Sequence, residues 1–120
     1  MPAGFFEVSA TMRQARLTDR QFVVLSSLLA RERSGREIRS RLRDQGYRMS
    51  LPAFYRLMAR LEDIGWVSGR YESLVIDRQA VRERRYKAKA EGRRAWDETR
   101  LFFDQQSKAA LADAKGVAHA

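Results

Sequence analysis

A helical spacing of apolar residues begins directly after Leu17. Thr18 and Gln21 can form a capping box, in which each side chain bonds the backbone N–H of the other residue. The apolar positions that follow recur at helical spacing: Phe22, Leu25, Leu28 and Leu29. They predict a first helix over about residues 18–32, whereas residues 1–16 show no such period and are expected to form an N-terminal arm.

A shorter and strongly basic helix is predicted next. Ser34 and Glu37 form a second capping box at its start. Gly46 can end it in a left-handed conformation, so the expected helix covers about residues 35–45.

The third predicted helix is amphipathic. Ser50 can cap it, Pro52 falls in its first turn, and Gly65 ends it. The side expected to be buried holds Phe54, Leu57, Leu61 and Ile64. The opposite, exposed side holds Ala53, Tyr55, Arg56, Ala59, Arg60 and Asp63.

The pattern then changes to that of strands. Residues 66–71 and 82–88 predict two strands, with Tyr86 buried on the second. The residues between them, 73–81, contain no strong two-residue turn and are expected to form a long hairpin tip. A fourth helix is predicted over about 91–114, followed by a flexible tail at 115–120.

Three helices, a hairpin and a final helix in this order predict a mainly α, single-domain winged helix-turn-helix fold. Residues 17–90 would form the winged helix-turn-helix region with a two-stranded wing. In this layout the third helix rests its apolar side on the first two helices, and its outer side is free to enter a DNA groove.

Composition excludes several classes of protein. The chain has no cysteine, so disulfide frameworks and cysteine-based zinc sites are ruled out, and its single histidine, His119, lies at the end of the chain. No catalytic set and no phosphate-binding glycine loop occurs, so we expect neither an enzyme nor a cofactor nor a metal site. No apolar run reaches membrane length and the first residues lack signal-peptide features, which predicts a cytoplasmic protein without a membrane partner.

Charge indicates the partner. The net charge is +9, and 20 of the 24 basic residues are arginine. Residues 31–60 carry nine arginines against three carboxylates, a net of +6, and residues 66–94 carry nine basic residues against four, a net of +5. The rest of the chain is slightly acidic. The excess therefore lies in the predicted helix-turn-helix and wing, which favours double-stranded DNA.

Two groups of residues are candidates for DNA contact. On the third helix they are Ser50, Ala53, Tyr55, Arg56 and Arg60; on the wing they are Arg70, Arg78, Arg82 and Arg84. Arginine suits both phosphate and the edge of guanine. The alternatives are an ordinary amphipathic helix with solvated arginines, and wing charges that only protect the strand edges.

Aromatic residues on the last helix indicate an interface. Trp96, Leu101, Phe102 and Phe103 span more than one side of the helix, so a single core cannot bury them all. Phe5 and Phe6 in the N-terminal arm are also too apolar for a free tail. Dimer packing is the favoured interpretation, and a pocket for a small aromatic effector between subunits is the other.

The sequence resembles the PadR family of bacterial transcriptional regulators over about residues 17–103. The segments that carry the resemblance are LTDRQFVVLSSL, SGREIRSRL, MSLPAFYRLMARLEDIGWVSG and ERRYKAKAEGRRAW. In the third of these, the residues at family motif positions are Ser50, Tyr55, Leu57, Leu61, Glu62, Gly65 and Val67. Ala88 and Lys89 depart from the family pattern, which usually has Leu and Thr there.

The resemblance implies a homodimeric repressor whose single C-terminal helix forms the dimer. Some members bind aromatic or cationic molecules between subunits, and Trp96 and Phe103 could line such a space here. Two-fold symmetry would require an inverted-repeat operator with half-sites about 10 bp apart. The alternative function is a winged-helix protein-interaction adaptor that does not read DNA.

Overall fold

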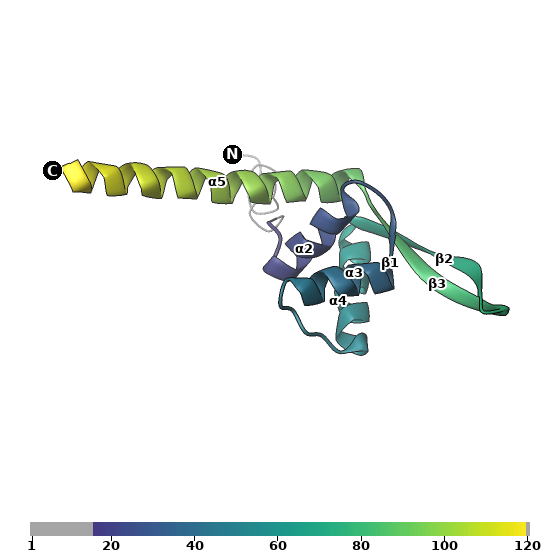
Figure 1. Cartoon of the computed structure of the whole chain (residues 1–120). Helices are drawn as coiled ribbons and strands as arrows, with labels where there is room; N and C mark the ends of the chain where they lie inside the picture. The colour runs from purple at the N-terminus through teal and green to yellow at the C-terminus, as the bar shows by residue number, and fades with distance from the viewer. Residues whose placement is uncertain (1–15, 120) are drawn as a thin grey trace, which may run out of the picture.

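The computed structural model describes residues 16–119, with side chains as far as residue 116 (Figure 1). The elements are α2 (Asp19–Leu28), β1 (Arg33–Ser34), α3 (Gly35–Asp44), α4 (Leu51–Ile64), β2 (Val67–Ile76), β3 (Gln79–Ala88) and α5 (Ala90–His119). This order confirms the mainly helical winged arrangement. The expectations for the N-terminal arm, including Phe5 and Phe6, lie outside the described residues.

Local hydrogen bonds define where the first three helices begin. Both predicted capping boxes are present, Thr18 with Gln21 on α2 and Ser34 with Glu37 on α3. The Ser50 hydroxyl accepts a hydrogen bond from the Ala53 N–H at 3.2 Å and caps α4. These bonds satisfy backbone donors that have no partner within the helix, so each helix has a defined start.

The sheet has a third strand that the sequence pattern does not reveal. Its order is β1-β3-β2, all antiparallel, and β1 consists of only Arg33 and Ser34, which pair with Tyr86 and Arg85. A two-residue strand is too short to show a period. The chain must leave the helix to reach this pairing, and α2 accordingly ends at Leu28 rather than near residue 32.

The prediction of a long hairpin tip over residues 73–81, without a two-residue turn, is wrong. Strands β2 and β3 pair without interruption from Val67 with Ala88 to Ile76 with Gln79. Asp77 and Arg78 alone form the turn, with φ of 51° and 66°. Both turn residues are left-handed, which matches the twist of the strands, and the apolar run before Asp77 favours extended backbone.

The core lies between the three short helices and the base of the sheet. Its buried apolar residues include Val24, Leu25, Leu28, Ile38, Leu42, Phe54, Met58, Leu61, Val67 and Tyr86. On α4 the prediction was wrong at two positions, because Met58 is buried whereas Ile64 is 43% exposed. Phe54, Met58 and Leu61 follow i, i+4, i+7 spacing, so the next position on that side is Gly65.

Helix α5 is far longer than the body that it packs on. Its first turns contact α2 and bury Ala95 and Thr99. From Phe103 to Gly116 every side chain is exposed, and Figure 1 shows this part projecting beyond the other helices. Thirty residues span about 45 Å. The helix continues to His119 instead of ending near Ala114, since no proline interrupts it.

Within the described part of the chain, none of the helices combines the length and the apolar character needed to cross a membrane.

Candidate nucleic-acid interface

The outer side of α4 presents three large polar side chains to solvent. Tyr55 is 51% exposed, and Arg56 and Arg60 are also exposed. Together with Ala59, Asp63 and Ile64, the two arginines line a shallow hollow of about 410 Å³. None of the described carboxylates forms an ion pair with Arg56 or Arg60. Their guanidinium donors are therefore available to a ligand.

Ser50 and Ala53 lie at the start of the same helix. The Ser50 oxygen accepts the N–H of Ala53, so the hydroxyl keeps its own proton for donation to another group. Ala53 is half-buried, and its small side chain leaves the first turn of α4 accessible. The first turn of a helix favours an anion, because its free N–H groups and the helix dipole point outward.

Two of the wing arginines are also available. Arg78 lies in the exposed turn between β2 and β3. The exposed Arg82 lies over the ring of Tyr71, with its guanidinium carbon 4.3 Å from the ring centroid. Neither forms an ion pair with a described carboxylate. The exposed edge of the wing therefore carries cations on β3 and at its tip.

Arg84 instead points toward α4. Its guanidinium pairs with the Glu62 carboxylate at 2.5 Å and lies 4.7 Å from the Tyr71 ring centroid. Burial opposes the charged form of Arg84, but the hydrogen bond and charge of Glu62 outweigh it and raise the pKa of the guanidinium. A Cβ on Gly69 would collide with both Glu62 and Arg84. A side chain at this position of β2 would therefore displace the charged ends of this ion pair.

The charges of this ion pair also act on Tyr86. Burial is the main cause that raises the pKa of its hydroxyl, and the negative charge of Glu62 adds to the effect. Tyr86 is thus a neutral, buried residue that anchors the base of β3 in the core.

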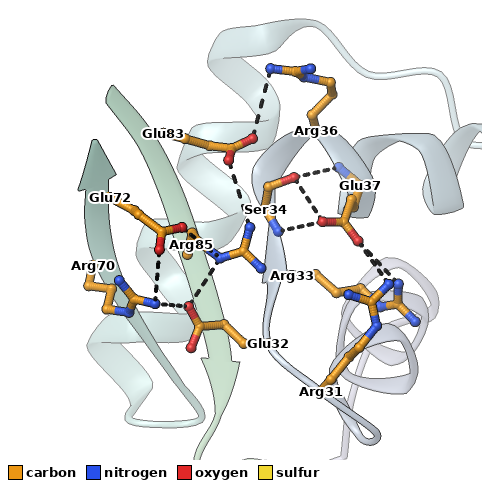
Figure 2. Close-up of polar contacts among 10 residues, drawn as sticks. All are labelled: Arg31, Glu32, Arg33, Ser34, Arg36, Glu37, Arg70, Glu72, Glu83 and Arg85. Atoms are coloured by element: carbon orange, nitrogen blue, oxygen red, sulfur yellow. Dashed lines mark hydrogen bonds and ion pairs between the residues drawn. The ribbon is translucent and has the colours of Figure 1, made fainter. Parts of the chain in front are cut away.

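Arg70 belongs to a second ion-pair network, shown in Figure 2. It contacts Glu32 at 2.7 Å and Glu72 at 3.8 Å. Arg85 contacts the same two carboxylates, at 3.2 Å and 3.4 Å. Glu32 precedes β1, so these contacts connect the wing to the segment between α2 and α3. Arg70 and Arg84 therefore form ion pairs within the chain. The candidate arginines without an ion pair to a described residue are Arg56, Arg60, Arg78 and Arg82.

The aromatic residues of α5 have different surroundings. Trp96 stacks on Phe22, with centroids 5.5 Å apart, and its Nε1 donates to the Ser26 hydroxyl at 2.8 Å. Phe102 is half-buried beneath the Arg16 guanidinium. Leu101 and Phe103 are exposed, Phe103 by 57%. Trp96 therefore packs and hydrogen-bonds within the chain, and Phe103 is the most exposed aromatic residue of this set.

A groove lies beside Phe103. Its volume is about 410 Å³, and its lining residues are Leu17, Thr18, Asp19, Phe22, Val23, Tyr47, Thr99, Arg100 and Phe103. It connects the exposed part of α5 with α2.

Several residues of these sites were not predicted from the sequence. Glu62, Gly69 and Tyr71 hold Arg84 in place, yet they lie on a helix and a strand with no local pattern that joins them. Arg39, Arg43 and Arg48 line a separate basic cleft. The four-residue spacing of Arg39 and Arg43 on a helix is the one signal that could have indicated a shared side.

No protein-family profile matches the chain, and no curated relative matches it. Solved structures do match. A PadR family transcription regulator from Clostridium difficile superposes with a TM-score of 0.67 at 15% identity, covering 81% of this chain and 99% of that one. The chain has the fold of the PadR-family regulators.

Two further structures agree. A PadR family transcriptional regulator from Eggerthella lenta matches with a TM-score of 0.57 at 23% identity, over 97% of this chain and 95% of that chain. A transcriptional regulator from Clostridium thermocellum matches with a TM-score of 0.61 at 21% identity, over 78% and 87%. The resemblance to the PadR family seen in the sequence is thus confirmed as a likeness of fold.

Proposed function

We propose that this chain is a PadR-type transcriptional regulator that binds specific DNA sequences in the cytoplasm. The observation that carries the proposal is the outer side of α4. In a winged helix-turn-helix fold this side presents Tyr55, Arg56 and Arg60, and no described carboxylate pairs with the two arginines. Unpaired guanidinium groups on an exposed helix fit the edges of bases in the major groove.

The two arginine groups have different roles in this proposal. Arg56 and Arg60 contact bases, with Tyr55 and Ser50 binding adjacent phosphates. Arg78 and Arg82 on the wing contact the backbone beside the groove. The ion pairs of Arg70 and Arg84 favour a role in positioning the wing.

A homodimer is the second part of the proposal. The projecting part of α5 has an apolar stripe at helical spacing, formed by Phe103, Ala110, Leu111 and Ala114. An exposed stripe on a helix that leaves the body is suited to pair with a second copy. Such a dimer would repress transcription from an inverted-repeat operator with half-sites about 10 bp apart.

An aromatic effector remains a prediction. The groove beside Phe103 could hold such an effector, because its walls include the apolar residues Leu17, Phe22 and Val23. Trp96 is already stacked on Phe22 and does not line the groove. It would therefore support Phe22 rather than contact the ligand.

Selection of bound fragments from a random duplex library, followed by sequencing, tests the function. We expect an enriched inverted repeat and a gel shift that weakens steeply with salt. Retention on heparin with no enriched sequence and no gel shift would instead support the adaptor that does not read DNA.

A further inference from the structure

A basic cleft lies between α3 and the loop that leads into α4. Its volume is about 370 Å³, and its lining residues are Arg39, Leu42, Arg43, Tyr47, Arg48 and Met49. Leu42 is buried and Tyr47 and Met49 are half-buried, so the floor of the cleft is apolar. Arg43 and Arg48 are exposed, and Arg39 is half-buried. Three guanidinium groups therefore surround an apolar floor.

Within the described part of the chain, these arginines have no partners of opposite charge. Among the described residues, none of Arg39, Arg43 and Arg48 forms an ion pair, and the cleft lining contains no carboxylate. Asp44 follows Arg43 in the chain but makes no ion pair with it. Arg39 instead lies over an aromatic ring: its guanidinium carbon is 5.8 Å from the centroid of Phe54. Three like charges in one cleft repel each other and attract an anion.

The cleft adjoins the start of α4. Met49 on its wall immediately precedes Ser50, which caps that helix. In Figure 1 the loop from α3 to α4 lies on one side of α4 and the β2–β3 hairpin lies on the other. The proposed reading helix thus has a cationic surface on each side.

We propose that this cleft binds the sugar–phosphate backbone of DNA on the side of α4 opposite the wing. The inference rests on the proposed function, because it assumes that α4 enters the major groove. The three guanidinium groups hold one or two phosphates, and the apolar floor contacts a deoxyribose. With the wing on the other side, the two surfaces clamp both backbone walls of one groove and set the position of α4 between them.

The test compares a pair of double variants with the same change in charge. Arg43→Ala with Arg48→Ala removes two exposed cations from the cleft, and Arg93→Ala with Arg94→Ala removes two exposed cations near the start of α5 as the control. The Kd for a duplex selected by the wild-type chain is measured at several salt concentrations. Each lost phosphate contact reduces the steepness of the fall of log K with log salt, that is, the magnitude of the negative slope, by about 0.9.

For the cleft variant, we expect the magnitude of the slope to fall by about 2 and the affinity near 0.1 M salt to fall by about 10- to 100-fold. Its preference among sequences should be unchanged. The control should keep the wild-type slope. Ethylation of single phosphates should interfere with wild-type binding at one flanking site and no longer do so with the cleft variant.

Three results would overturn the inference. If the wild type binds duplex DNA but the cleft variant keeps its slope, the cleft does not contact the backbone and the proposed function survives. If inorganic phosphate titrated alone binds the wild type but not the cleft variant, while both have the same slope on DNA, the cleft serves a free anion. If the wild type itself binds no duplex, the proposed function fails together with the inference.

Discussion

The arginines of this chain divide according to whether a carboxylate lies within reach. Arg33 and Arg85 are largely buried and paired, whereas Arg56 and Arg82 are exposed with no described ion pair. Ion pairs of the first kind hold chain segments together, and exposed cations of the second kind are free to bind polyanions. A count of basic residues does not separate the two groups, although in the proposed function only the second contributes donors for DNA.

Arg78 illustrates a conflict between folding and binding at a single residue. It adopts a φ of 66° in the two-residue turn, a conformation that glycine accepts without strain. Arg78→Gly should therefore raise the free energy of unfolding, by up to about 1 kcal/mol, while it weakens DNA binding by removing one phosphate contact. Thermal unfolding and the salt slope of binding measure the two effects. A lower melting temperature would show that the turn does not favour glycine.

Glu37 makes the stability of the chain depend on acid. Burial favours its neutral form, but the hydrogen bond from the Ser34 backbone and the charges of Arg31 and Arg33 outweigh this and hold its pKa below the ordinary 4.5. Because the folded pKa is depressed, the contribution is complete above pH 4.5 and is lost as pH falls through the folded pKa.

Glu37→Gln should remove that dependence. Gln21 occupies the same position in the other capping box, so glutamine is compatible with the cap. The variant should be less stable than the wild type at pH 7 and approach it at lower pH, as followed by urea unfolding. A constant difference at every pH would show that the charge of Glu37 does not contribute.

At the scale of elements, the pair formed by Glu62 and Arg84 connects α4 to the wing. If it positions the wing, Glu62→Gln should weaken DNA binding by about fivefold, equivalent to about 1 kcal/mol. This is expected even though the change removes a negative charge. Arg84→Gln should cost a similar amount, and the double variant no more than either, as determined from Kd values in a double-mutant cycle.

Asp63→Asn provides the matched control. Asp63 is the exposed neighbour of Glu62 on α4 and makes no ion pair with a described residue. Removing its charge should leave binding unchanged or improve it. Binding by Glu62→Gln that is stronger than binding by Asp63→Asn would mean that the released Arg84 contacts phosphate directly, contrary to the positioning role.

If α4 is the reading helix, its arginines and those of the wing should differ in what they contribute. Arg56→Ala should reduce the preference for the selected duplex over a scrambled one by about 1–3 kcal/mol, because it removes a base contact. Arg82→Ala should weaken binding to both duplexes alike and lower the salt slope by about 0.9, because it removes a phosphate contact. Competition between the two duplexes measures both. Equal loss of preference in both variants would contradict these roles.

At the scale of the whole molecule, the projecting half of α5 carries exposed apolar side chains that the proposed dimer would cover. Phe103 and Leu111 are 57% and 63% exposed in the apolar stripe of α5. Leu111→Glu places a charge in this stripe and should convert a dimer to a monomer in sedimentation experiments, with loss of high-affinity binding to the inverted repeat.

Gln105→Glu is the control for added charge. Gln105 lies on the opposite side of α5, about 200° around the helix from Phe103. It should leave the dimer intact. A monomeric wild type, or a Leu111→Glu variant that remains dimeric, would show that this stripe is not the contact between subunits.

The sequence alone determined the features that depend on neighbouring residues. Both capping boxes, the Ser50 cap, the end of α4 at Gly65 and the order of the helices and the two wing strands involve bonds or periods within a few residues. The local sequence favours them in any tertiary setting. The resemblance to the PadR family added the repressor role and agrees with the dimer that the aromatic residues of the last helix indicate; both are still proposals.

Only the tertiary structure decided the rest. The pairing of β1, the closure of the hairpin to two residues, and the choice of Met58 over Ile64 depend on what packs opposite each residue. Arg84 pairs with Glu62, which is 22 residues away in the sequence, and Trp96 donates a hydrogen bond to Ser26, which is 70 residues away. Such contacts form when distant segments fold together, so the local pattern contains no sign of which arginine is paired and which is free to bind.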